Sequence, residues 1–295
     1  MESAHRRIKW SEDDVAKVTF FLCAGISILV LFSIIMYLFC NGIPFVARYG
    51  FSAFLFGTKW DISSSSPKYG ILAMSLTTLI LTAISTLIGG LLGVFSAIAL
   101  YKFVPKKIAG VCNYLIQLLA GIPSVVFGLF GMTFIVPFVR DYVSSNGVGY
   151  GILSSSIVLG VMILPTVTSM SLNALNSVDK SYYEGSLALG MNKVQSVFQT
   201  VLPSAKSGIL AGIILGLGRA LGETMAVMMV IGGSAVMPTS LTKSVRTLTA
   251  NIAMGANELT GEPLEALIAC GCVLFVFTLL IYLVLGLLNR KRKAK

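Results

Sequence analysis

Six long apolar runs constrain the fold of this chain more than any other feature of its sequence. A helix that crosses the hydrocarbon core of a bilayer needs about 20 mostly apolar residues. Six segments meet this requirement: residues 18–40, 71–100, 109–138, 151–175, 207–231 and 266–288. Only 12% of the residues are charged, about half the share found in soluble domains. The sequence therefore predicts an all-α integral membrane protein with six transmembrane helices.

The basic residues predict how the chain is oriented. Because six spans are an even number, both termini lie on the same side. Fifteen Lys and Arg residues fall on that side and six on the other, and loops rich in Lys and Arg face the cytoplasm. We therefore expect a cytoplasmic amino-terminal segment (1–17), a six-helix transmembrane domain (18–288) and a basic cytoplasmic tail (289–295). This asymmetry explains the net charge of +10 without a nucleic-acid partner.

Two charges interrupt the fifth apolar run. Between residues 207 and 237, Arg219 and Glu223 are the only charged residues. A charge at the bilayer centre costs roughly 2.5–3.5 kcal/mol even on the gentler insertion scales, so both side chains must face the protein interior. At the i,i+4 spacing they can pair on one helix. Two roles stay open for this pair: an ion pair that fixes the bundle, or a polar element on a solute pathway.

Small residues at four-residue spacing predict where the helices touch. Lipid tails are as apolar as leucine, so membrane helices associate through close contact of small residues. Two stripes have this spacing: Ser85, Gly89, Gly93 and Ala97 in the second run, and Gly208, Gly212 and Gly216 in the fifth. On a helical projection the second stripe shares a face about 80° wide with Arg219 and Glu223. We expect both stripes to lie at helix–helix contacts.

The third run contains the segment GIPSVVFGLFG at residues 121–131. Pro123 predicts a kink there, and the glycines permit close approach of another helix. Ser124 can hydrogen-bond the backbone groups that the proline frees. A span kinked at Gly121 and Pro123 suits a gate, and it suits ordinary membrane packing equally well.

The inner loop, residues 176–206, is more than a connector. Ser181 and Glu184 form a potential capping box that starts a short helix, which Gly190 can end. Asn192, with a glutamine three residues later, predicts a second start. The apolar face of the second helix consists of Val194, Val197, Phe198 and Val201, before Pro203. The loop should therefore form two short helices with an elbow at Gly190, and a hairpin lying on the membrane surface fits the same pattern.

The inner loop resembles the coupling loop of bacterial ABC-importer permeases. That family has Glu-Ala-Ala, three residues, Gly, nine residues, Ile, one residue and Leu-Pro. The matching positions in this chain are Glu184, Gly185, Ser186, Gly190, Leu202 and Pro203. Gly185 and Ser186 replace the two alanines with small residues, and Thr200 replaces the isoleucine. In the family this short helix docks into a groove on the ATPase subunit.

Two membrane motifs narrow the resemblance. GIPSVVFGLFG, together with LGRALGETMAV at residues 217–227, is similar to the permeases of phosphate-specific importers, and more to the PstC type than to the PstA type. The resemblance implies the type I ABC-importer architecture in the bacterial inner membrane, with Arg219, Glu223, Ser124 and Thr224 as candidate pathway residues. It also implies three kinds of partner: a PstA-type permease, a dimer of PstB-type ATPase subunits and an external PstS-type phosphate-binding protein.

The chain lacks the residues for chemistry of its own. An ATP-binding P-loop needs a Gly-Lys step, which the sequence does not contain. Its single histidine, His5, lies near the amino terminus, and its five cysteines lack metal-site spacing. We therefore expect no enzyme activity, metal or cofactor in this chain, with ATP and Mg²⁺ bound by the partner ATPase.

Three alternatives to a phosphate importer remain at this point. An ABC permease for another oxyanion, such as sulfate or molybdate, has the same loop. A secondary transporter would show inverted internal repeats, and no convincing repeat is present. A membrane scaffold or sensor would need no ATPase partner.

The charge asymmetry makes the orientation testable. Single cysteines at positions 193 and 290–295 should be protected from an impermeant thiol reagent added outside, whereas those at 59 and 243 should react. The background chain would lack the five native cysteines. Labelling of position 193 but not 243 from outside would overturn this topology.

Overall fold

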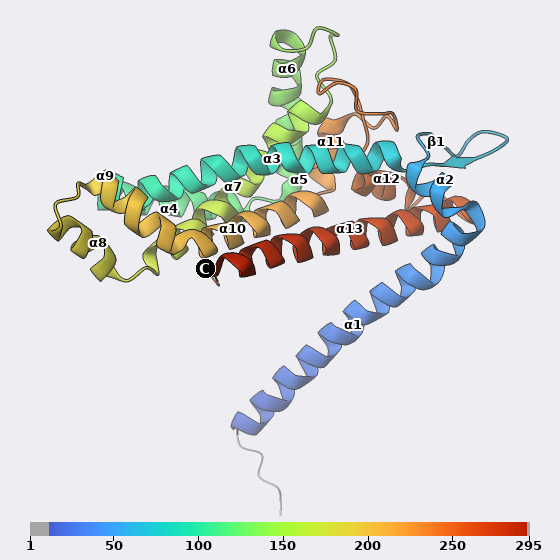
Figure 1. The fold of residues 1–295 in the computed structure, drawn as a ribbon. Helices are drawn as coiled ribbons and strands as arrows, with labels where there is room; N and C mark the ends of the chain where they lie inside the picture. Colours follow the sequence, from blue (N-terminus) through green and yellow to red (C-terminus); the bar gives the residue numbers. More distant parts are fainter. Residues whose placement is uncertain (1–11, 294–295) are drawn as a thin grey trace, which may run out of the picture.

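The computed structural model describes residues 12–293 and is almost entirely helical (Figure 1). The predicted segments 1–17 and 289–295 lie partly outside these residues. The elements begin with α1 (Glu12–Tyr49), α2 (Phe51–Phe56), the hairpin strands β1 (Trp60–Asp61) and β2 (Lys68–Tyr69), α3 (Leu72–Ile98), α4 (Lys106–Gly121), α5 (Ser124–Phe130) and α6 (Val136–Tyr142). They continue with α7 (Ile152–Asn176), α8 (Lys180–Ala188), α9 (Lys193–Gln195), α10 (Leu202–Gly222), α11 (Met225–Ile231), α12 (Leu248–Gly255) and α13 (Glu262–Lys293).

Six helical stretches of the described chain are long and apolar enough to cross a membrane. They are Ala16–Tyr49, Leu72–Phe103, Ser124–Tyr142, Ile152–Asn176, Lys193–Gly222 and Glu262–Leu287. The predicted number of spans is confirmed. The third and fifth spans begin and end elsewhere than the sequence predicted, because both predicted runs contain a break.

Helix α7 forms the centre of the bundle and packs against α3 and α10. A Cβ atom at Gly89 would lie 2.4 Å from the carbonyl oxygen of Gly160 on α7. A Cβ atom at Gly216 of α10 would lie 2.8 Å from the side chain of Val167 on the same helix. Both predicted stripes therefore face α7, where only small residues allow the backbones to come so close.

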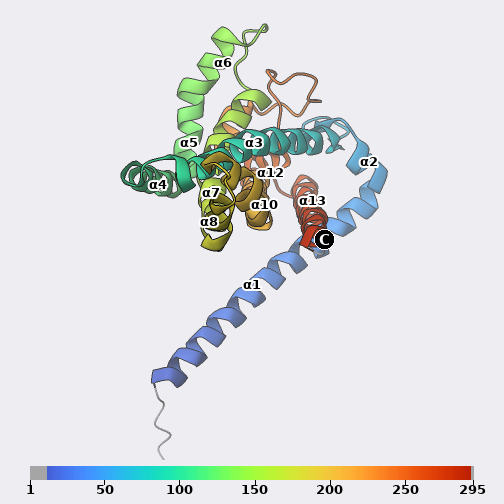
Figure 2. The same cartoon turned by 60° about the vertical axis from the view of Figure 1, so that its left-hand side comes forward.

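The third predicted span, residues 109–138, is not one kinked helix. It ends at Gly121 and restarts at Ser124, because Ile122 and Pro123 are both extended. Proline disfavours a helical conformation at the residue before it and cannot donate a hydrogen bond to the preceding turn. The axis of helix α4 therefore differs in direction from that of α5 and α6, which project away from the bundle (Figures 1 and 2). The hydroxyl of Ser124 makes no hydrogen bond within residues 12–293, so the predicted hydrogen bond to backbone groups freed by the proline is not present.

Two π-helical segments carry the chain past prolines. Gly131–Ile135 precedes Pro137, and Ser196–Val201 precedes Pro203. A wider turn before each proline accommodates the missing N–H and the bulk of the ring. As a result α9, the π-helical segment and α10 form one stretch from Lys193 to Gly222. The prediction of a second short, separate helix in the inner loop is therefore wrong.

The end of the bundle that the sequence predicts to lie outside is closed by aromatic side chains. Phe45 is stacked on Tyr49 and meets Phe54 and Tyr69 edge to face, with ring centroids 5.3–5.8 Å apart. The backbone N–H of Tyr69 donates to the hydroxyl of Tyr49. The hairpin Trp60–Tyr69 is held on the bundle in this way.

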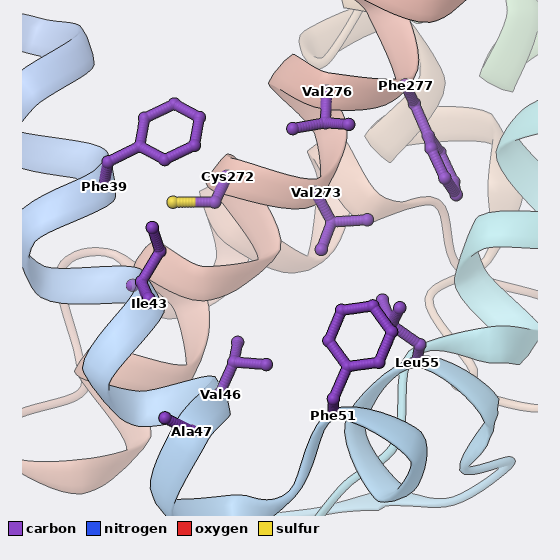
Figure 3. Close-up of a pocket in the computed structure, with 11 residues that line it drawn as sticks. Phe39, Ile43, Val46, Ala47, Phe51, Leu55, Cys272, Val273, Val276 and Phe277 are labelled. Atoms are coloured by element: carbon purple, nitrogen blue, oxygen red, sulfur yellow. The ribbon is translucent and has the colours of Figure 1, made fainter.

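Helix α1 contacts α13 near the carboxyl end of α1. Toward its amino end, α1 diverges from the bundle (Figures 1 and 2). An apolar groove of about 440 Å³ lies where the two helices separate. Its lining includes Phe39 and Ile43 of α1 and Phe277 of α13, and it contains no charged side chain (Figure 3). The thiol of Cys272, also on the lining, donates to the carbonyl of Leu38. Such a surface suits lipid or another hydrophobic helix and offers nothing to bind an ion.

The contact between α3 and α7 gives a prediction with a matched control. Substitution Gly89→Ala should destabilise the purified chain by about 1–3 kcal/mol, because the new methyl group would overlap Gly160 and Ile163. Substitution Gly90→Ala should be neutral or stabilising, because no atom lies within 4 Å of its Cβ position. Thermal unfolding in detergent measures both. Equal melting temperatures for the two variants would contradict the close packing.

Candidate functional site

The first helix of the inner loop, α8, begins at Asp179. The Asp179 carboxylate accepts a hydrogen bond of 2.8 Å from the backbone N–H of Ser181. This bond lowers the pKa of Asp179. The predicted capping box of Ser181 and Glu184 is therefore wrong, because the aspartate two residues earlier takes the capping position. The helix itself lies where the sequence predicted it.

Gly190 ends α8, as predicted. Its φ of +88° lies in the left-handed region. Its N–H donates to the carbonyl of Leu187, and the N–H of Met191 donates to that of Ser186. This pair of bonds is the Schellman motif, which satisfies the last carbonyls of a helix and favours glycine. Gly190 is therefore a fixed elbow between α8 and the long helix that follows.

The second helix of the inner loop begins at Asn192, also as predicted. The Asn192 side chain accepts from the N–H of Gln195, and the Gln195 side chain accepts from the N–H of Asn192. On the face beyond this capping box, Val197 and Val201 are fully buried. Val194 and Phe198 remain exposed, so the predicted apolar face is half buried.

Tyr183 connects α8 to the inner end of α3. The ammonium group of Lys102, in the π-helical segment Ala99–Phe103, lies 4.6 Å from the centroid of the Tyr183 ring and 5.2 Å from that of Tyr101. Tyr183 also packs against a buried cluster formed by α3, α7 and α10. The sequence indicated neither contact, because Lys102 could be read only as an inner basic residue.

The face of α8 that is turned away from the bundle is exposed and could contact another protein. Glu184, Gly185 and Gly190 are exposed, and Leu189 is 85% exposed. Tyr182 and Leu187 add further exposed apolar surface. The other positions that match the family pattern lie on the buried side of the loop. Ser186 is buried, Leu202 packs on the buried cluster of α3, α7 and α10, and Pro203 lies in the first turn of α10.

The fifth span breaks at Glu223. Helix α10 ends at Gly222, and Glu223 has an extended conformation with φ −69° and ψ 127°. The Glu223 carboxylate accepts from the N–H of Ala226 at 3.1 Å, and its backbone carbonyl accepts from the hydroxyl of Thr249 at 3.2 Å. The Thr224 hydroxyl donates to the carbonyl of Gly222. Polar side chains therefore satisfy the backbone at this break, as in discontinuous transporter helices.

Arg219 does not pair with Glu223. Within the described chain, the Arg219 guanidinium donates to the hydroxyl of Thr166 at 3.3 Å and forms no ion pair. The predicted i,i+4 pair requires a continuous helix, and the break at Glu223 turns the carboxylate toward α11. Thr166 lies near the middle of α7, so Arg219 lies at that level of the bundle. Arg219 is therefore a half-buried cation whose charge no carboxylate of residues 12–293 neutralises.

The two broken spans meet just beyond their breaks. A Cβ atom at Gly128 of α5 would lie 2.7 Å from the sulfur of Met229 and 3.0 Å from the Cα of Ala226, both on α11. Helices α5 and α11 therefore pack tightly together. Ser124 begins α5, and no hydrogen bond connects it to Arg219 or Glu223. In the described chain, no group of three or more His, Cys, Asp or Glu residues is placed to hold a metal ion.

Comparisons with known proteins identify the family. Residues 89–294 match the family described as binding-protein-dependent transport system inner membrane component. The chain belongs to this family. The inner loop and both broken spans lie within the matched region.

Relatives of this inner membrane component include named permeases. It is 38% identical to the probable ABC transporter permease protein YqgH of Bacillus subtilis, over 92% of this chain and 89% of the relative. It is 34% identical to the phosphate transport system permease protein PstC of Mesorhizobium japonicum, over 88% and 84%. The predicted resemblance to PstC-type permeases is confirmed.

Solved structures support the fold. A bacterial alginate ABC transporter matches with a TM-score of 0.64 at 18% identity, over 95% of this chain and 96% of that one. An inward-facing MetNI methionine transporter matches with a TM-score of 0.58 at 20% identity, over 74% and 93%. The ABC-importer permease architecture is confirmed. The family match and the six spans confirm a multi-pass protein of the bacterial inner membrane.

The elbow at Gly190 gives a prediction for this inner membrane component. Substitution Gly190→Val should leave the chain inserted but weaken its binding to the ATPase subunit and abolish ATP-driven uptake. A β-branched residue is strained at φ +88°, so the end of α8 should unwind. Co-purification of the ATPase and uptake in vesicles measure the effect.

Gly185→Ala is the matched control for Gly190→Val. Gly185 lies within helix α8, with no atom within 4 Å of its Cβ position, so alanine should be tolerated there. Normal uptake by a well-expressed Gly190→Val chain would refute the role of this elbow.

Proposed function

We propose that this chain is a transmembrane permease subunit of an ATP-driven importer for inorganic phosphate. The observation that carries the proposal is the similarity to PstC permeases along most of the chain. The guanidinium of Arg219, just before the break in the fifth predicted span, is a group that could bind phosphate. Arg219 presents a guanidinium to the interior of the bundle, and guanidinium binds phosphate oxygens well through paired, charge-assisted hydrogen bonds.

The geometry of Arg219 suits transient binding. Its hydrogen bond to Thr166 is long and has a neutral partner, so an anion can replace it at low cost. Glu223 lies four residues further along the chain, beyond the end of α10, and its carboxylate accepts from the N–H of Ala226 on α11. In a pathway, binding must be strong enough for entry and weak enough for release. A single cation with a carboxylate nearby meets both needs.

The long helix from Lys193 to Gly222 would connect ATP hydrolysis to this site. Its first turn follows the elbow at Gly190, and its last turn carries Arg219. A displacement of α8 by the ATPase would act on both ends of the bundle through this helix. The contact of Tyr183 with Lys102 would pass the same displacement to α3. The bundle could then alternate its access between the two sides.

The remaining partners follow from this role. A second, PstA-type permease would complete the pathway, and the exposed aromatic and aliphatic residues of α8 would dock into a PstB-type ATPase dimer that binds ATP and Mg²⁺. A PstS-type phosphate-binding protein would deliver the anion from outside. The chain itself would bind no cofactor and hydrolyse no ATP. Both termini would be cytoplasmic.

Two rival functions remain distinguishable. An importer of sulfate or molybdate would use the same architecture, and competition by these anions against phosphate uptake separates the three substrates. A secondary transporter would take up its solute without an ATPase. The match to a binding-protein-dependent family favours the ABC importer.

Substitution of Arg219 tests the pathway role. In proteoliposomes that hold the complete transporter, Arg219→Lys should lower ATP-driven phosphate uptake about tenfold or more, because a point charge cannot reproduce the planar fork. Assembly with the partner subunits should be unchanged. Uptake of radioactive phosphate and gel filtration of the complex measure the two quantities.

Thr166→Val is the control for this test. It removes the hydrogen-bond partner of Arg219 at nearly constant volume and should retain most of the uptake. If Thr166→Val abolishes uptake as fully as Arg219→Lys does, Arg219 serves to hold α10 against α7 and the pathway role is wrong.

A further inference from the structure

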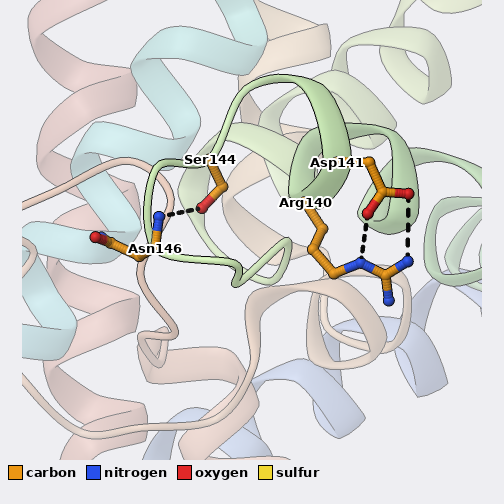
Figure 4. Close-up of polar contacts among 4 residues, drawn as sticks. All are labelled: Arg140, Asp141, Ser144 and Asn146. Carbon is orange, nitrogen blue, oxygen red and sulfur yellow. Dashed lines mark hydrogen bonds and ion pairs between the residues drawn. The ribbon is translucent and has the colours of Figure 1, made fainter.

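The arginines on the predicted outer side of the bundle differ in how their charges are balanced. Arg48 forms an ion pair with Glu265. Arg140 donates to both carboxylate oxygens of Asp141, at 2.7 and 3.3 Å (Figure 4). Arg246, in the loop between α11 and α12, forms no ion pair with any carboxylate of the described chain.

Arg246 is held in place by neutral groups only. Its Nε donates to the carbonyl of Gly233 at 2.6 Å, and its Nη1 donates to Oδ1 of Asn251 at 3.0 Å. Its Nη2 has no hydrogen-bond partner within residues 12–293. Burial lowers the pKa of Arg246, but an arginine in a protein stays protonated. The positive charge is therefore oriented and partly desolvated, and no ion pair within residues 12–293 balances it.

The loop that positions Arg246 is held in a fixed conformation by its own backbone hydrogen bonds. Gly232 and Gly233 both have positive φ, which reverses the chain after α11. The N–H of Gly233 then donates to the carbonyl of Val245, and the N–H of Val245 donates to that of Ile231. Removing a charge from water without a counter-ion is costly. A fixed loop that holds such a charge is suited to receive an anion.

A cavity beside Arg246 has room for that anion. It measures about 200 Å³ and is lined by residues of the outer hairpin and of helices α12 and α13 as well as by Arg246 itself. Since a water molecule takes about 30 Å³ in the liquid, a small tetrahedral anion fits together with several waters. Trp60 and Leu267 give the cavity apolar walls. The exposed Glu258 on its lining opposes tight binding of an anion.

The same short helix leads from the cavity to the break in the fifth span. Asn251 of α12 binds Arg246, and two residues earlier the hydroxyl of Thr249 donates to the backbone carbonyl of Glu223. The N–H of Leu248 donates to the hydroxyl of Thr78 on α3. Helix α12 therefore lies between the Arg246 cavity and the polar break that follows Arg219.

We propose that Arg246 and its cavity form a binding site for an inorganic oxyanion on the outer side of the membrane, occupied before the anion reaches Arg219. The oxyanion is phosphate if the chain has the function proposed above, on which this assignment rests. Arg246 would supply the charge and the free Nη2 donor.

Cysteine modification in the complete transporter tests the site. Met254 lines the cavity, and its side chain approaches Gly233, the glycine whose carbonyl binds Arg246. In a background without the native cysteines, Met254→Cys should react faster with an anionic than with a cationic methanethiosulfonate. Inorganic phosphate should slow the reaction, whereas chloride at equal ionic strength should not.

The Arg246 variants give the decisive comparison. Adding Arg246→Gln should abolish the preference for the anionic reagent and raise the phosphate concentration for half-protection about tenfold or more. Arg246→Lys keeps the charge and should keep the preference. Lys243→Gln changes an exposed basic residue of the same loop that does not line the cavity, and it should have no effect. Gel filtration of each complex verifies assembly.

Three outcomes would overturn the proposal. In the first, phosphate protects Met254→Cys equally with and without Arg246. In the second, chloride protects as well as phosphate, which would mean that the cavity responds only to ionic strength. In the third, the ligand-free binding protein protects and phosphate does not, which would make the cavity a docking site for a carboxylate of that protein.

Uptake by the same proteoliposomes separates this proposal from the proposed function. Phosphate uptake without protection by phosphate would refute the Arg246 site alone. Uptake of sulfate in place of phosphate, with protection by sulfate, would refute the proposed substrate and support the oxyanion site.

Discussion

The close contact of α7 with α3 and α10 is the constraint on which the rest of the structure depends. In a membrane no hydrophobic driving force brings helices together, so backbone proximity must supply the attraction. Gly89 and Gly216 allow that proximity on two sides of α7. Because α7 is held on both sides, α10 has a fixed position, and with it both the elbow at Gly190 and the cation at Arg219.

Polar chemistry is concentrated where the helices are interrupted. The third and fifth predicted spans each break, and the segments after the breaks, α5 and α11, pack on each other through Gly128. At the second break the Glu223 carboxylate and the Thr249 hydroxyl satisfy backbone groups that a continuous helix would satisfy itself. A break within a membrane is stable only with such partners. These partners are also groups that a passing solute can engage.

Much of the inner loop could be predicted because its signals are local. A capping box at Asn192, a left-handed glycine at Gly190 and the spacing from Glu184 to Pro203 each involve residues close in sequence. Residues close in sequence also explain the two wrong predictions for this loop, the cap of α8 and the end of the second helix. Asp179 caps α8 in place of Ser181, since its carboxylate accepts from the N–H of Ser181 and the helix begins before Ser181 could act as a cap. The π-helical segment before Pro203 keeps the helix continuous where a proline predicted an end.

By itself the sequence determined the number of spans, the two small-residue stripes, the coupling-loop pattern and the family, because these depend on apolar run length and on fixed spacings along the chain. Only the tertiary structure decided the partners of the buried charges. Arg219 meets Thr166, 53 residues away, and Glu223 turns to α11 instead of pairing with it. Arg246 meets Gly233 and faces a cavity formed with Trp60 and Leu267. A helical projection assumes an unbroken helix, whereas this one is broken at Glu223, where two local hydrogen bonds and one from Thr249, 26 residues away, satisfy the backbone.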